Sequence, residues 1–195
     1  MYDLVIVGGG PAGASAAIFA SHAGLQTAVL DADKGMTRRA MIHNHLGFPD
    51  GITGPDLVDR GQEQALRAGA EWVKADVSSL ERRDDGFVLT TDDGRTFEAR
   101  EILLTIGANM DLARQAGLKI HPGTEPRIRE VVAVDAAGRS SVPGVWAAGT
   151  AAGVSVHTIV TAGDGARVAV NIISGQQGQR YVWHDVLQPR PEATA

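Results

Sequence analysis

The sequence contains no cysteine and only three lysines, which stand apart at positions 34, 74 and 119. Without cysteine, catalysis by a thiol, disulfide bonds, and zinc or iron–sulfur sites built on cysteine are excluded. Nucleic acids and anionic membrane surfaces bind proteins that concentrate positive charge, whereas this chain has a formal net charge of −5. We therefore expect no nucleic-acid partner.

Long apolar runs are also missing. No stretch approaches the ~18 consecutive apolar residues of a membrane-spanning helix. No basic segment typical of a signal peptide precedes the first apolar residues. We expect a cytoplasmic protein without a membrane partner. The histidines have no spacing typical of a metal site, so no metal is expected.

Residues 1–31 have the pattern of one βαβ unit. Residues 4–7 are a short apolar run rich in β-branched side chains, typical of a buried parallel strand. A glycine-rich turn follows, then an alanine-rich helix over residues 14–23. A second strand over residues 27–30 ends at Asp31. Such a unit is the building block of nucleotide-binding sheets.

Short strands and turns dominate the rest of the chain. Asp-Asp-Gly occurs at residues 84–86 and again at 92–94, which predicts two hairpins on either side of the apolar run 87–89. Strands are also expected over residues 101–105, 131–134 and 144–148, and helices over 56–68 and 162–173. Residues 32–54 and 109–130 are expected to be irregular.

The glycine-rich turn has the spacing Gly8-x-Gly10-x-x-Gly13, with Pro11 and Ala12 inside it. In such a turn the first glycine allows a sharp bend and the second lets a pyrophosphate approach the backbone. The third lets the helix pack closely on the strand, so that the positive helix N-terminus faces the phosphates. Asp31 closes the second strand, where a carboxylate accepts ribose hydroxyls.

These residues resemble the FAD-binding half of the flavoproteins with two dinucleotide-binding domains. Residues 44–55, which contain Asn44 and a Gly-Phe-Pro sequence, are similar to the Asn-x-x-Gly-Phe-Pro segment of the thioredoxin reductase family. Residues 105–108, 141–149 and 161–166 also resemble segments of that family, in the same order. The chain is identified as a short form of the thioredoxin reductase-like, FAD-dependent pyridine nucleotide-disulfide oxidoreductases.

The resemblance implies an α/β fold, a three-layer Rossmann-like FAD-binding domain with a parallel sheet and a small antiparallel β-meander. It also implies FAD as the cofactor. The residues expected to bind it are Gly8, Gly10, Pro11, Ala12, Gly13, Asp31, Ala32, Arg39, Asn44, Val77, Thr105, Gly107, Gly149, Thr150, His157 and Thr158.

The chain departs from the family between residues 109 and 130. There the family inserts a second dinucleotide domain of ~100 residues, which carries the redox-active Cys-x-x-Cys pair. We expect a single FAD-binding domain over residues 1–187. Its two halves are residues 1–108 and 131–187, joined by the short connection 109–130, and a disordered tail follows over residues 188–195. Without the cysteines, disulfide reduction is not expected.

Two departures concern the flavin itself. Thr150 stands where the family has an Asp that hydrogen-bonds the ribityl chain, and losing that charge-assisted bond would weaken FAD binding by about 1 to 2 kcal/mol. His157 and Thr158 replace an Arg-Gln pair. His157 is the candidate catalytic residue, as a proton donor or charge near the flavin. Its alternative role is a structural histidine at a helix start.

The expected function is an oxidoreductase or an electron-transfer module, reduced by free NAD(P)H or by a donor protein. The sequence leaves open a second kind of partner, a protein that accepts electrons from this chain. The apolar surface that would face the missing domain favours a homodimer. Two alternatives remain: a non-catalytic FAD-binding redox sensor or interaction module, and an interaction protein that binds no flavin.

Overall fold

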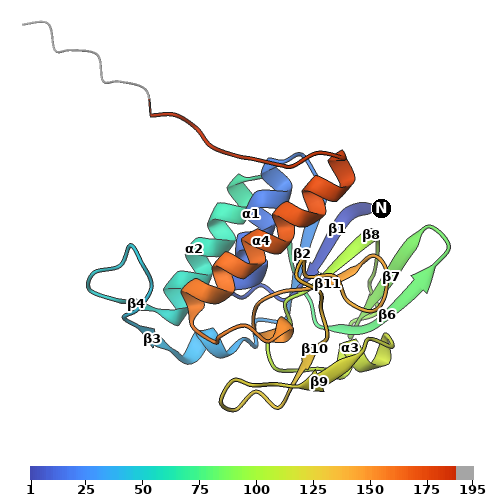
Figure 1. The fold of residues 1–195 in the computed structure, drawn as a ribbon, viewed down its shortest axis with the longest axis horizontal. Helices are drawn as coiled ribbons and strands as arrows, with labels where there is room; N and C mark the ends of the chain where they lie inside the picture. The colour runs from blue at the N-terminus through green and yellow to red at the C-terminus, as the bar shows by residue number, and fades with distance from the viewer. Residues whose placement is uncertain (188–195) are drawn as a thin grey trace, which may run out of the picture.

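Parallel strands form the centre of the computed structural model, which describes residues 1–187 (Figure 1). The tail expected at residues 188–195 lies outside the described residues. Within the seven-stranded sheet, five strands run parallel. In spatial order they are β5 (Glu71–Lys74), β2 (Thr27–Asp31), β1 (Tyr2–Val7), β8 (Thr96–Leu104) and β11 (Val145–Ala147).

The β1 strand is buried on both faces because its side chains alternate between two hydrophobic clusters. Leu4 and Ile6 pack with the helices, whereas Val5 and Val7 pack toward the opposite face. The helices are α1 (Pro11–His22), α2 (Gly54–Arg67) and α4 (Thr158–Gln177), and they lie together on one side of the sheet (Figure 1). Helix α4 is longer at both ends than the helix expected over residues 162–173.

The opposite face of the sheet is covered by an antiparallel meander of β6 (Val77–Arg83), β7 (Gly86–Thr91) and the first part of β8. Phe87 of β7 lies opposite Ala99, whereas Ile102, later in β8, lies opposite Val145 of β11. The β8 strand therefore pairs both within the antiparallel meander and within the parallel sheet. The strand expected over residues 101–105 is the end of this longer strand.

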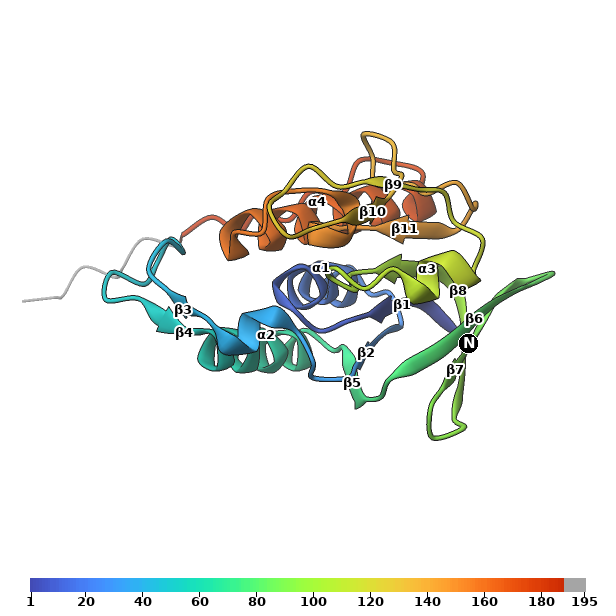
Figure 2. The ribbon, with the colours of Figure 1, turned by 90° about the horizontal axis from the view of Figure 1, so that it is seen from below.

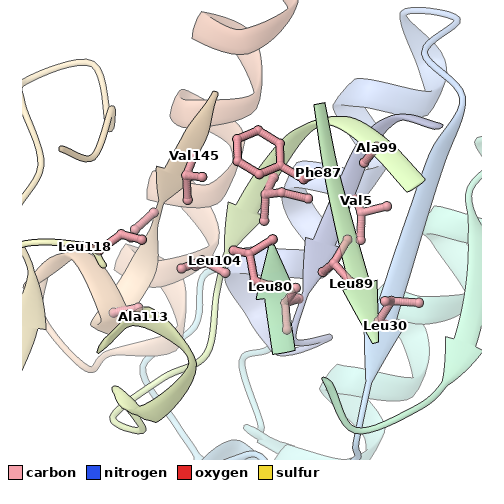
Figure 3. Close-up of a cluster of buried hydrophobic side chains, with 14 of the residues drawn as sticks. Val5, Leu30, Leu80, Phe87, Leu89, Ala99, Leu104, Ala113, Leu118 and Val145 are labelled. Atoms are coloured by element: carbon pink, nitrogen blue, oxygen red, sulfur yellow. The ribbon is translucent and has the colours of Figure 1, made fainter. Parts of the chain in front are cut away.

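The second core cluster joins the meander to the parallel sheet. Figure 3 shows Leu80, Phe87 and Leu89 of the meander directed toward Val5 and Leu104 of the sheet. Ala113 and Leu118 lie at its left side in Figure 3, so the connection over residues 109–130 also packs on this core. The expected three-layer α/β fold with a parallel sheet and an antiparallel meander is confirmed.

Both segments expected to be irregular contain short elements. Residues 32–54 hold the 3₁₀ helix η1 (Met36–Arg39) and a hairpin of β3 (Met41–Ile42) and β4 (Ile52–Thr53). Residues 109–130 hold α3 (Asp111–Gln115) and β9 (Ile120–Pro122), which pairs with β10 (Glu130–Val132). Strands of two or three residues carry too little periodicity to be found in a sequence. No helix among residues 1–187 is long and apolar enough to cross a bilayer.

Helices α1 and α4 approach each other closely where glycine removes a side chain. A Cβ added at Gly165 of α4 would lie 2.0 Å from the backbone oxygen of Ala12. By contrast, a Cβ added at Gly163, also in α4, would meet no atom within 4 Å. The two glycines share one helix but differ in whether a methyl group fits.

Replacing Gly165 with Ala should therefore destabilise the fold, since the obstructing atom is backbone and the helices must separate. We expect the free energy of unfolding to fall by about 1–3 kcal/mol, as for other overpacked cores. The control Gly163→Ala should leave stability unchanged or raise it by up to about 1 kcal/mol. Urea unfolding followed by circular dichroism measures both; equal effects of the two variants would contradict the close approach.

Candidate functional site

The carboxyl ends of the parallel strands converge at one edge of the sheet, where ligands bind in open α/β folds. The glycine turn follows β1, Asp31 ends β2, Thr105 follows β8, and Gly149 lies just after β11. These segments come from both halves of the chain. The fold thus brings the predicted residues of both halves to a single edge.

The glycine turn is anchored to the neighbouring strands by hydrogen bonds. The Gly8 amide donates to the Leu30 oxygen at 2.8 Å, and the Thr105 hydroxyl lies 3.0 Å from the Val7 oxygen and 2.7 Å from the Gly8 oxygen. Gly8 has a φ of +102°, which favours glycine. A Cβ at Gly13 would lie 1.9 Å from the Gly8 oxygen. Gly8, Gly13 and Thr105 therefore fix the shape of the turn.

The N-terminus of α1 is free to bind an anion. Gly10 is its N-cap and provides no side-chain cap, and Pro11 begins the helix. Within residues 1–187, the amides of Ala12 and Gly13 donate to no acceptor. A Cβ at Gly10 would meet nothing within 4 Å, so Gly10 borders open space. Unbonded amides at a positive helix end with room in front of them fit a pyrophosphate.

A small hollow lies beside Asp31, between the glycine turn and α2. It is lined by Gly9, Gly10, Asp31, Asp33, Gly35, Thr37, Arg38 and Val58. Arg38 forms ion pairs with Asp33 at 2.6 Å and with Asp59 at 2.5 Å. Arg39, which the resemblance implied, is exposed and lies outside this lining, so the structure places its neighbour Arg38 at the hollow.

Asp164 holds the loop after β11 in place. Its Oδ2 accepts the Gly149 amide at 2.8 Å, and its Oδ1 pairs with Arg167 at 2.8 Å. The Asp164 side chain is only 7% exposed, so its charge is compensated by these partners. Thr150 is buried in the 3₁₀ helix η2 (Gly149–Ala152). Sequence reasoning missed Asp164, although it lies inside the segment 161–166 that carries the resemblance.

Two histidines flank the N-terminus of α4. His45 Nδ1 lies 2.9 Å from the hydroxyl of the buried Thr158, and partial burial lowers the pKa of His45. His157 is exposed, and its Nδ1 lies 2.7 Å from the Ser155 hydroxyl. Sequence reasoning gave His45 no role at the site. A contact across 113 residues leaves no local signal that could have identified it.

The remaining predicted residues lie around this edge. Asn44 is exposed next to His45 on the β3–β4 loop, Ala32 follows Asp31, and Val77 is the first residue of β6. Gly107 lies in the turn after β8, with a φ of +63°. Among residues 1–187, no group of three His, Asp or Glu side chains is arranged to hold a metal ion.

A family model described as pyridine nucleotide-disulphide oxidoreductase matches the chain over residues 2–72 and 52–166. The chain is 35% identical over 113 residues to the bifunctional thioredoxin reductase/thioredoxin of Mycobacterium leprae, covering 56% of this chain and 25% of that protein. It is 33% identical over 124 residues to the thioredoxin reductase of Helicobacter pylori, covering 61% of this chain and 39% of that protein. The chain thus spans between a quarter and two fifths of these relatives' length.

Solved structures show the same fold. A thioredoxin reductase from Gloeobacter violaceus superposes with a TM-score of 0.81 at 18% identity, over 95% of this chain and 99% of that chain. The atypical thioredoxin reductase TRi from Desulfovibrio vulgaris Hildenborough gives a TM-score of 0.75 at 21% identity, over 91% and 99%. The family model matches most of the chain, and these structures share its fold. The chain therefore belongs to the pyridine nucleotide-disulphide oxidoreductase family of FAD-binding flavoproteins.

Proposed function

We propose that this chain holds FAD across both halves of its fold and passes electrons without reducing disulfides. The observation that carries the proposal is the open N-terminus of α1, where Gly10 leaves space and the amides of Ala12 and Gly13 are unbonded within the described residues. When bound, FAD would accept and release electrons, and the protein would bind and orient it.

Each part of the site has a proposed role. Gly8, Gly10, Pro11, Ala12 and Gly13 hold the pyrophosphate at the positive end of α1. Asp31 accepts the adenosine ribose hydroxyls, and Ala32, Arg39 and Val77 line the adenosine end. Thr105, Gly107, Gly149 and Thr150 support the middle of the cofactor, and Asn44, His157 and Thr158 border the flavin end.

Disulfide reduction is left out of the proposal because the sequence has no cysteine. Residues 109–130 contain a short helix and a strand, so they supply no second dinucleotide fold between the two halves. The reductant in this proposal is free NAD(P)H or a donor protein.

Exposed apolar side chains near the flavin end support a homodimer as part of the same proposal. They lie on η1, on the β3–β4 hairpin, and just before and within the first turn of α4, and 39% to 87% of each residue is accessible: Met36, Met41, Leu46, Val156, Ile159 and Val160. A second copy covering them would remove apolar surface from water.

The second candidate is a non-catalytic FAD-binding redox sensor or interaction module. Thr150 favours it, because a buried threonine stands where the resemblance implies a carboxylate next to the ribityl chain. A flavin that binds but accepts electrons from no soluble donor would fit this alternative.

Gly10→Glu should weaken FAD binding while leaving the protein folded, because the position borders open space and its φ of −67° suits any residue. The new carboxylate would repel the pyrophosphate at the helix end. We expect the Kd for FAD to rise at least about tenfold, or 1.4 kcal/mol. Quenching of flavin fluorescence measures it.

The matched control is Gly175→Glu. It adds the same charge at an exposed position near the C-terminal end of α4, with nothing within 4 Å of the new Cβ. Its Kd should equal that of the unmodified protein. Equal affinity in all three proteins would place FAD elsewhere.

Anaerobic reduction separates the candidate functions. The FAD-loaded protein should lose its yellow colour with NADH, NADPH or a reduced donor protein, and should not reduce a disulfide substrate, since no thiol is present to exchange. Absorbance of the flavin follows the first result and thiol release the second. A protein that takes up no FAD would overturn the proposal, and a flavin that no donor reduces would favour the sensor.

A further inference from the structure

Glu125, Ser155 and His157 form a continuous hydrogen-bonded chain beside the N-terminus of α4. The Ser155 hydroxyl lies 3.2 Å from Glu125 Oε2 and 2.7 Å from His157 Nδ1. The Val156 amide also donates to Glu125 Oε2, at 3.4 Å. The carboxylate thus contacts two successive residues of the loop that leads to His157.

Glu125 comes from the connection between β9 and β10, which lies at the level of α4 in Figure 2. This connection belongs to residues 109–130, the segment that joins the two halves of the fold. It therefore brings a charged group to the end of the site at which His157 lies. His45 also lies at this helix end, where its Nδ1 contacts the Thr158 hydroxyl.

The direction of these two hydrogen bonds follows from which of the three side chains can donate a proton. An ionised carboxylate only accepts hydrogen bonds, so the Ser155 hydroxyl must donate its proton to Glu125. Its oxygen then has lone pairs left and accepts from His157, which requires the proton of that ring to be on Nδ1. In neutral His157 the unprotonated nitrogen is therefore Nε2.

We propose that Glu125 and Ser155 are positioning residues that fix His157 as the Nδ1-protonated tautomer and leave Nε2 to exchange protons with a substrate during electron transfer. The proposal rests on the proposed function, since it places a reacting group near His157. The substrate class is a small acceptor that takes up a proton together with electrons.

The acceptor is reduced by electrons from the reduced FAD of the proposed function, which is oxidised, and the accompanying proton comes from these groups and water. Doubly protonated His157 gives its Nε2 proton to the acceptor and becomes neutral, with the remaining proton still on Nδ1 and bonded to Ser155. Because His157 is exposed, water returns a proton to Nε2 after the transfer. Glu125 takes no part in the proton transfer and only orients the hydroxyl.

Nuclear magnetic resonance of protein with ¹⁵N-labelled histidine reads the tautomer directly, with His157→Gln used to assign the signals. Neutral His157 should carry its proton on Nδ1 in the unmodified protein and in Ser155→Thr, which keeps the hydroxyl. Ser155→Ala should allow the Nε2-protonated form. Glu125→Gln should also allow the Nε2-protonated form. A glutamine side-chain amide can donate to the Ser155 oxygen, and the Ser155 hydroxyl can then donate to an unprotonated His157 Nδ1.

Glu130→Gln is the matched control. It removes a carboxylate from the same hairpin, where Glu130 pairs with Arg114, and it should leave the tautomer unchanged. The Nε2-protonated form in the unmodified protein, or Nδ1 protonation retained in both Ser155→Ala and Glu125→Gln, would overturn the positioning role.

A kinetic measurement tests the proton step separately. In the FAD-loaded protein, Ser155→Ala should slow reoxidation of the reduced flavin by a quinone, a proton-accepting acceptor, about tenfold. Reoxidation by ferricyanide, which takes electrons alone, should be unaffected. Equal slowing with both acceptors, or none with the quinone, would contradict the proton role. If the protein bound no FAD, the proposed function would fail, while the tautomer measurement would still decide the positioning role.

Discussion

Helices from the two halves of the fold, α1 and α4, approach each other closely at Ala12. Gly165 of α4 packs against the Ala12 oxygen, and a Cβ at Gly149 would lie 2.9 Å from the Ala12 Cβ. Small residues on three segments thus let the start of α1, the 3₁₀ helix η2 after β11 and the first half of α4 meet. Larger side chains would separate these segments, and the two halves would no longer border one site.

This contact explains why the carboxylate of Asp164 is buried. Once α4 is held against α1, Asp164 lies beside the loop after β11 and accepts the Gly149 amide. Arg167 compensates its charge and also donates to the Ala136 oxygen. A polar network therefore fixes the second half of the site, whereas the turn in the first half is fixed by Thr105 and by glycine geometry.

The central unit of the fold could be predicted because its signals are local. The apolar run of β1, the glycine spacing, and Asp31 at a strand end are properties of neighbouring residues, and the Asp-Asp-Gly turns predict the meander in the same way. The contacts of His45 with Thr158, Asp164 with Gly149, and Glu125 with Ser155 join segments 15 to 113 residues apart. They depend on packing, which no local pattern encodes. Which of two adjacent arginines of η1 lines the hollow beside Asp31 depends on packing in the same way, and here it is Arg38.

The central claim is that one FAD contacts both halves of the fold, and amide hydrogen exchange with and without FAD tests it most directly. We expect slower exchange in three separate segments, residues 8–14, 105–109 and 149–158, and unchanged exchange in the β6–β7 hairpin. Protection limited to the first segment would mean that the second half does not hold the cofactor. Unchanged exchange in all three segments at saturating FAD would contradict binding at this site.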